Sequence, residues 1–226
     1  QMKLLIVLAM LAARAASVED LSGQTFTFPV QNNRAHARLI TPKQEFRAPV
    51  CRTCRSFTDL GRSHSLFSLS TSGSHNSFLI FWNESDEEME VHIMDQRSEF
   101  RGLDYKPNMW HSVCTTWDSA TGLVQLWFNG MPTIRKYVPV TSAIPGTPVI
   151  ILGQEQDAHG GGFDSKQAFV GMMSDVHMWD YVLSSCEIQS YVDKLNFTPG
   201  NVLNWKALEF KITDKVLVEP KSIVCH

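Results

Sequence analysis

The sequence has no block of basic residues and no second long apolar run after its first residues. Of its 226 residues, 20 are Lys or Arg and 23 are Asp or Glu, which gives a formal net charge of −3. A protein that binds nucleic acid through its charge usually carries clustered basic residues, and none are found. The apolar stretch at positions 4–13 is too short to span a bilayer. We therefore predict neither a nucleic-acid motif nor a transmembrane segment.

Internal repeats and low-complexity tracts are also missing, so a single domain is the simplest organisation. Short apolar or alternating runs recur along the chain and are separated by polar turns, as in β-proteins. One of them ends at Asn129-Gly130, the strongest short signal for a β-hairpin. The predicted strands cover residues 26–28, 65–69, 77–82, 89–94, 110–117, 123–128, 149–152 and 169–179.

Only one segment has a convincing helical pattern. Ser184 and Glu187 form a capping box, in which Ser184 is the N-cap. Four apolar residues then fall on one helical face, namely Ile188, Tyr191, Val192 and Leu195. Many strands and one surface helix predict an all-β fold, a two-sheet antiparallel jelly-roll sandwich of the lectin-like kind.

The first 16 residues have the pattern of a secretory signal peptide. Met2-Lys3 gives a positive start, and Ala13-Arg14-Ala15 after the apolar stretch supplies a small-x-small cleavage context. We expect a secreted, extracellular protein whose one domain covers residues 17–226. Asn83 and Asn196 each begin an Asn-x-Ser/Thr acceptor site for glycosylation.

Secretion makes disulfide bonds between cysteines expected, but the five cysteines are an odd number. One thiol is therefore left over or pairs between chains. Cys51 and Cys54 have CxxC spacing, but neither a second CxxC nor clustered histidines accompany them. We interpret that spacing as incidental.

Oxygen-bearing side chains gather in the segment 153–167. Glu155, Asp157 and Asp164 supply carboxylates there, and Gln156 and Gln167 are among its amides. Calcium prefers oxygen ligands, and the three glycines at 160–162 let the backbone turn tightly. An acidic glycine-containing loop is more often plain solvated surface. Because apolar strands flank this loop on both sides, we predict that it holds calcium.

Catalysis by this loop is not predicted. Retaining glycosidases on similar folds need two carboxylates, commonly from a Glu-x-Asp-x-x-Glu strand. Glu155-x-Asp157 begins that pattern, but Gly160 stands where the last acid would be. A G-x-S-x-G nucleophile motif is missing too. We expect a binding protein, not an enzyme, and a calcium-dependent carbohydrate-binding lectin remains an alternative.

Several motifs, in order, resemble the pentraxin family. They are Cys114-Thr115-Thr116-Trp117-Asp118-Ser119 and the segments 80–82, 151–157, 178–184 and 201–205, and the resemblance extends from about residue 26 to residue 217. The resemblance implies a flattened jelly roll, a cyclic homopentamer and two adjacent calcium ions on one face of each subunit. It also implies phosphocholine as a ligand and complement components as partners on the opposite face.

The resemblance implies a metal-ligand set. Glu155 and Asp157 would share the two ions, Gln156 would offer its backbone carbonyl, and Gln167 would complete the second ion. Asp164 stands where the family has a glutamate. Asn76 matches a family asparagine from a distant strand, but its neighbour His75 replaces an aspartate ligand. Histidine is a poor calcium ligand, so we expect weaker binding of the first ion.

The resemblance also implies a ligand pocket and a disulfide, and fewer residues of this sequence match the family's at these two features. Phe81 stands where an aromatic residue lies beside the choline methyl groups, and Glu99 is a candidate for the choline-facing glutamate. Phosphoethanolamine or an anionic glycan remains open as the ligand, and without the family Phe81 would be assigned to the strand core. The implied disulfide is Cys51–Cys114, joining the two sheets. We add Cys186–Cys225 as a second pair, which leaves Cys54 as the odd cysteine.

Overall fold

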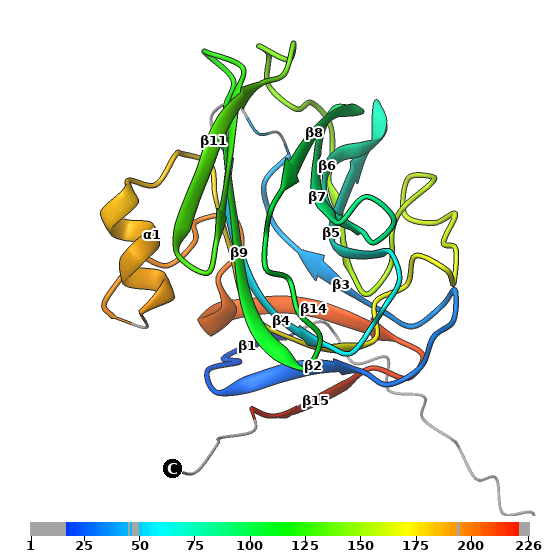
Figure 1. Ribbon diagram of the computed structural model, residues 1–226. Helices are drawn as coiled ribbons and strands as arrows, with labels where there is room; N and C mark the ends of the chain where they lie inside the picture. Colours follow the sequence, from blue (N-terminus) through cyan, green and yellow to red (C-terminus); the bar gives the residue numbers. More distant parts are fainter. Residues whose placement is uncertain (1–16, 45, 47–49, 194, 222–226) are drawn as a thin grey trace, which may run out of the picture.

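A computed structural model of the chain describes residues 17–44, 46, 50–193 and 195–221, with the backbone alone described at 50–53. Within these residues the chain forms two antiparallel sheets that face each other (Figure 1). The predicted all-β sandwich is therefore confirmed. The predicted signal peptide and Cys225 lie outside the described residues.

One sheet carries the strands that surround the candidate calcium loop. In spatial order its eight strands are β1 (Val18–Glu19), β14 (Leu208–Thr213), β3 (His36–Ile40), β12 (Val149–Leu152), β5 (His64–Thr71), β6 (Ser74–Asn83), β7 (Glu88–Ile93) and β8 (Gln96–Arg101).

The second sheet carries the strand with the cysteine–tryptophan motif. In spatial order its seven strands are β11 (Met131–Tyr137), β10 (Leu123–Phe128), β9 (Met109–Asp118), β4 (Val50–Thr58), β13 (Gly171–Trp179), β2 (Gln24–Phe28) and β15 (Leu217–Pro220). Asn129 and Gly130 have φ angles of 49° and 84°, as expected for the predicted hairpin between β10 and β11.

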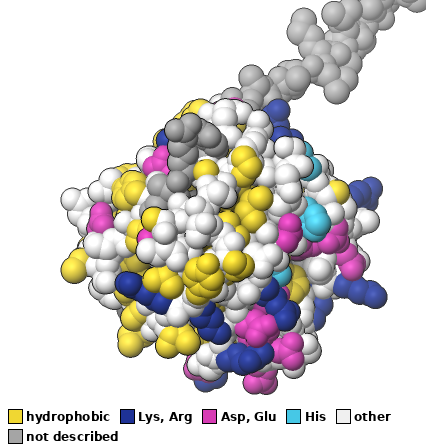
Figure 2. Space-filling view, turned by 90° about the horizontal axis from the view of Figure 1, so that it is seen from above, with side chains coloured by type: hydrophobic (Ala, Val, Ile, Leu, Met, Phe, Trp, Pro, Cys, Tyr) yellow, Lys and Arg dark blue, Asp and Glu magenta, His cyan; other side chains and the backbone are white. Residues whose placement is uncertain are grey.

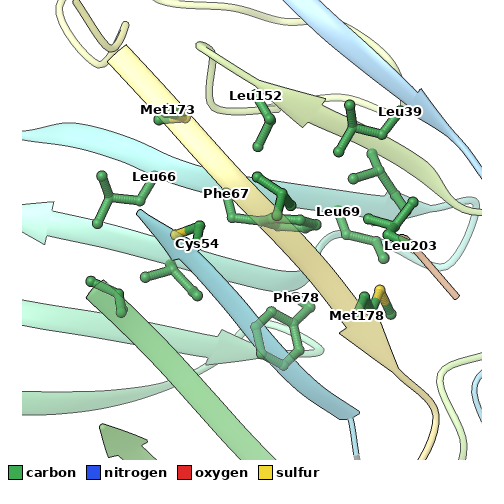
Figure 3. Packing of buried hydrophobic residues seen from close by; sticks show 14 of the residues in the cluster. Leu39, Cys54, Leu66, Phe67, Leu69, Phe78, Leu152, Met173, Met178 and Leu203 are labelled. Carbon is green, nitrogen blue, oxygen red and sulfur yellow. The ribbon is translucent and has the colours of Figure 1, made fainter. Parts of the chain in front are cut away.

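The main core fills the space between the two sheets. Leu69 and Phe78 from the eight-stranded sheet and Met173 from β13 are each fully buried there. Figure 3 shows such side chains from both sheets packed together, with Cys54 among them. Alternate residues of β6 therefore point inward, and those between them, Leu79 and Phe81 included, occupy the outer face of the sheet.

The helix α1 (Ser185–Val192) covers the outer face of the seven-stranded sheet (Figure 1). Its predicted capping box is confirmed, with the Ser184 side chain accepting from the Glu187 backbone N–H. Ile188 and Tyr191 are buried, but Leu195 lies beyond the helix and is 61% exposed. The predicted apolar face was therefore one turn too long. A short 3₁₀ helix, η1 (Trp205–Ala207), precedes β14.

Seven strands were not predicted from the sequence: β1, β3, β4, β8, β11, β14 and β15. Their sequences carry charged residues or prolines and lack a clear apolar run, as in the Gln-Arg-Ser-Glu-Phe-Arg of β8. β1, β8, β11 and β15 lie at sheet edges, where one side is not hydrogen-bonded to another strand of the described residues. Edge strands usually carry such polar residues, so hydrophobic patterning does not reveal them.

The cysteines of the implied disulfide lie on adjacent strands of one sheet. Cys51 on β4 is opposite Thr116 on β9, and Cys114 is opposite Thr53. The expectation that this pair joins the two sheets was therefore wrong, because β4 and β9 are neighbours in the seven-stranded sheet. The side chain of Cys51 is outside the description, so the Cys51–Cys114 bond stays a prediction.

The other described cysteines lie on both sides of the seven-stranded sheet. Cys54 belongs to the core between the sheets, whereas Cys114 packs with Trp127 and Ile188 on the helix side. Cys54 and Cys114 therefore face opposite ways. Cys186 is exposed on α1. The Cys186–Cys225 pair remains a prediction.

Candidate functional site

The loop between β12 and β13 is closed at its base and tied to the eight-stranded sheet. The Phe169 N–H donates to the Gly153 carbonyl over 3.0 Å, and the Ser65 N–H of β5 donates to the Gln167 carbonyl over 3.0 Å. Ala158 and Gly161 bond to each other across the glycine-rich turn. In Figure 1 the loop lies beyond β5, on the side of the molecule opposite α1.

Position 153, at the start of this loop, requires glycine. Its φ is +94°, and an added Cβ would lie 2.4 Å from Phe28 Cε1. A side chain at this position would pay for the left-handed backbone conformation and would also clash with the buried Phe28 ring. We expect Gly153→Ala to lower the free energy of unfolding by about 2–4 kcal/mol, measured by urea denaturation.

Gly61 offers the matched control for that substitution. It has no positive φ, and nothing lies within 4 Å of an added Cβ. Gly61→Ala should therefore leave the free energy of unfolding within about 0.5 kcal/mol of the wild type. Equal effects at the two positions would contradict the role assigned to Gly153.

Gln156 anchors the loop through its side chain. Its Nε2 donates to the Ser68 and Val149 carbonyls, each over 3.1 Å, and its Oε1 accepts from Ser70 Oγ at 2.7 Å and from the Gly160 N–H at 3.0 Å. The side chain is completely buried. Because the amide is engaged in this way, the backbone carbonyl is the group that Gln156 has to offer to a metal.

Three predicted ligands present buried oxygens that lack a donor. Asn76 Oδ1, Glu155 Oε2 and Gln167 Oε1 receive no hydrogen bond from the described part of the chain. A buried oxygen without a partner typically costs about 1–3 kcal/mol. A cation is a partner for oxygens that lack a donor, and hard divalent cations such as calcium favour carboxylate and amide oxygens. The residues present therefore fit calcium.

Asn76 reaches the loop through an irregularity in strand pairing. β5 and β6 pair regularly at Leu69 opposite Phe78, but the register shifts before Thr71 opposite Ser74. Asn76 lies in the shifted segment of β6, between Ser74 and Phe78, and Ser70 lies in the matching segment of β5, where its hydroxyl donates to Gln156. The strand and the loop, 79 residues apart between Asn76 and Glu155 in the sequence, thus meet at the same part of the sheet.

Glu155 is the most strongly perturbed acid of the site. Its side chain is almost fully buried, and burial followed by the neighbouring Asp157 carboxylate raises the pKa of Glu155 to about 7. Both effects disfavour the ionised form. A divalent cation would reverse them, because it neutralises both carboxylates.

The other predicted acids are more open. Asp157 and Asp164 are exposed, and Asp164 Oδ1 accepts from the Lys166 N–H at 2.9 Å. In the described part of the chain, no three His, Cys, Asp or Glu residues come close enough together to hold a metal ion. The donor set therefore depends on amide oxygens, and the role of Asp164 stays a prediction.

Asp95 is an acid near the site that the sequence did not single out. Its N–H donates to the Asn76 carbonyl over 3.1 Å, and its Oδ1 lies 3.9 Å from His75 Nε2. Asp95 belongs to the turn between β7 and β8. Because β8 was not predicted, nothing in the sequence placed this turn beside Asn76.

The two predicted ligand-pocket residues lie on the outer face of the same sheet. Phe81 is half-buried and belongs to neither buried hydrophobic cluster in the described residues. Its assignment to the strand core is therefore wrong. Phe81 is opposite Glu90 on β7, and Glu90 is opposite Glu99 on β8. Phe81 and Glu99 thus occupy one row across three strands.

The two predicted glycosylation sites differ in accessibility. Asn196 is exposed, whereas Asn83 Nδ2 already donates to Asp86 at 3.0 Å and to Glu90 at 2.9 Å. A glycan attaches to that nitrogen. Asn196 is therefore the more accessible of the two acceptors.

The family is decided by comparison with known proteins. A model of the Pentaxin family matches residues 24–220, which is most of the chain. The chain belongs to the Pentaxin family. Its members, the pentraxins, are calcium-dependent recognition proteins, so this pentraxin is a pattern-recognition protein and not an enzyme.

Individual relatives agree with this assignment. Mouse serum amyloid P-component is 37% identical over 221 residues, covering 96% of this chain and 96% of the relative. The human protein of the same name is 35% identical over 201 residues, or 89% of each. The heptameric pentraxin of Limulus polyphemus, described as similar to serum amyloid P-component, superposes with a TM-score of 0.77 at 25% identity, covering 89% of this chain and 96% of that one.

Proposed function

We propose that this pentraxin binds phosphate-bearing ligands, such as phosphocholine or phosphoethanolamine, through two calcium ions held by the loop 153–167 and β6. The observation that carries the proposal is the set of buried, donorless oxygens on Asn76, Glu155 and Gln167. Asn76 comes from β6, and Glu155 and Gln167 come from the loop; buried oxygens of this kind that lack a donor are what a metal site needs.

Charge explains why the ligand would be an anion. Two calcium ions bring four positive charges, and the carboxylates of Glu155, Asp157 and Asp164 return three negative ones. The loaded site keeps a net positive charge, so it attracts the oxygens of a phosphate. The carboxylate of Asp95 lies 3.9 Å from His75 Nε2, beside this set, and is not counted among the calcium ligands in this sum.

Phe81 would contact the rest of the ligand. It is half-buried on the outer face of β6, the strand that carries Asn76. An aromatic face attracts methyl groups and, more weakly, a cationic head. The Phe81 ring therefore suits the organic part of a phosphorylated ligand that is bound at calcium.

The wider biology follows from the relatives. We propose a secreted protein, because its similar curated relatives are named as serum components. We propose a homo-oligomer, pentameric as the family resemblance implies, although the Limulus neighbour is heptameric. Complement components stay a proposal for the opposite face. No helix within the described residues is long and apolar enough to cross a membrane.

Retention on two kinds of beads tests the proposal. With calcium present, we expect the protein to bind phosphocholine beads and to be released by a chelator, and to pass through beads that carry a neutral sugar. Phe81→Ala should weaken retention, because the aromatic contact is lost. Binding to the neutral sugar in preference would favour the lectin alternative, and retention that survives the chelator would contradict the calcium mechanism.

A further inference from the structure

The surface beside Phe81 carries an unusual pattern of paired charges. Two rows of facing residues cross β6, β7 and β8 on the outer side of the sheet: Phe81, Glu90 and Glu99 in one row, and Leu79, His92 and Arg97 in the other. The second row is the nearer to Asn76, and the turn of Asp95, two residues before Arg97, is bonded to the Asn76 carbonyl.

Glu99 is neutralised by two arginines of its own strand. Its Oε1 lies 2.6 Å from Arg97 Nη2, and its Oε2 lies 3.1 Å from Arg101 Nη2. Both carboxylate oxygens are therefore already paired. A ligand ammonium group would have to compete with two guanidinium groups, which form strong charge-assisted bonds to carboxylates.

Glu90 is paired in the same manner. Its Oε1 accepts from Arg97 Nη1 at 3.1 Å, and its Oε2 lies 2.9 Å from His92 Nε2. The side chain of Glu90 is 8% exposed and that of Glu99 28%, whereas those of Arg97 and Arg101 are 48% and 65% exposed. The two carboxylates therefore lie beneath the guanidinium groups of Arg97 and Arg101, which form the solvent-exposed surface at this place.

On the face shown in Figure 2, acidic and basic side chains are likewise intermixed and do not form separate blocks. Beside Phe81, the ion pairs of Glu90 and Glu99 decide which charges a ligand meets. A guanidinium group has five N–H donors, and the bonds to Glu90 and Glu99 use two of those on Arg97. Arg97 keeps donors for a ligand.

We propose that Arg97 makes this site select ligands that carry a second anionic group beyond the calcium-bound phosphate, in preference to ligands that carry an ammonium group. The inference rests on the proposed function and specifies its ligand class. A second carboxylate or phosphate gains hydrogen bonds from an exposed guanidinium group, whereas an ammonium group meets a like charge.

Two small ligands of similar length test the selectivity. Phosphoethanolamine carries a phosphate and an ammonium group, and 2-phosphoglycolate carries a phosphate and a carboxylate. By calorimetry on the calcium-loaded full chain, we expect 2-phosphoglycolate to bind about tenfold more tightly, as one charge-assisted bond would provide. Equal affinities, or a preference for phosphoethanolamine, would overturn the inference.

Substitution of Arg97 provides the second measurement. Arg97→Met should weaken 2-phosphoglycolate binding by about tenfold and strengthen phosphoethanolamine binding, because one partner of Glu99 is removed. Arg97→Lys, which keeps the charge, should keep the order of preference. Arg135→Met, on β11 of the other sheet, is the control and should change neither affinity. If Arg97→Met leaves the ratio of affinities unchanged, Arg97 does not set the selectivity.

The same binding measurements distinguish an error in the proposed function from an error in the role of Arg97. If neither phosphate ligand binds to the calcium-loaded wild type, the phosphate site itself is wrong. If both bind and only the order of preference differs from expectation, the phosphate site stands and the role of Arg97 falls. The wild-type ratio is measured without any variant, so the test holds even where Arg97→Met folds poorly.

Discussion

Calcium at about 100 times its dissociation constant is expected to stabilise the folded chain by about 2.7 kcal/mol, because calcium binds the folded state and not the unfolded chain. For a chain of this size, that gain corresponds to a rise of about 5–10 °C in the melting temperature. Glu155→Gln should abolish most of the rise, because the buried carboxylate beside Asp157 is replaced by an uncharged amide. Differential scanning calorimetry with and without calcium measures the rise in the wild type and its loss in the variant.

The Glu155→Gln variant separates a lost ligand from a lost fold. The introduced amide has nearly the shape of a protonated glutamate, so the calcium-free variant should melt at or above the temperature of the calcium-free wild type. Glu219→Gln, at an exposed position on β15, is the matched control and should keep the full calcium effect. A calcium effect of wild-type size in Glu155→Gln would contradict the assignment of Glu155.

Calcium-free protein is expected to lose stability as the pH rises from about 4.5 to above 7. The folded-state pKa of Glu155 is raised from 4.5 to about 7 by burial and by Asp157. The folded state therefore holds a proton in this window that the unfolded chain has released, so its contribution is present at low pH and is lost as the pH rises through 7. The loss amounts to about 3 kcal/mol at most.

Calcium should reverse this dependence. Binding requires the ionised carboxylate, so it releases a proton near neutral pH, and the affinity should fall by up to about tenfold for each pH unit below 7. Calorimetry in buffers of different ionisation enthalpy measures the released proton. Other acids also titrate in this range, so the difference between wild type and Glu155→Gln isolates the contribution of Glu155. If the two proteins show the same pH dependence, the raised pKa has no part in binding.

Local signals were sufficient for the parts of the fold that depend on neighbouring residues. The Asn129-Gly130 turn and the capping box of Ser184 and Glu187 were confirmed, since each satisfies its own backbone within a few residues. The polar edge strand β8 gave no such signal. Its pairing with β7 brings Asp95 to Asn76 and Arg97 to Glu90, and so decides the charges around the site.

The sequence by itself determined the all-β class, the oxygen-rich loop and the motifs of the Pentaxin family, because apolar alternation, turn residues and ligand types are all properties of short stretches of chain. The tertiary structure alone decided that Asn76, Glu155 and Gln167 bury unsatisfied oxygens, that Cys51 and Cys114 share a sheet, and that Glu99 lies beneath arginines. Each of these depends on strand register and burial, which arise only when distant segments pair and exclude water.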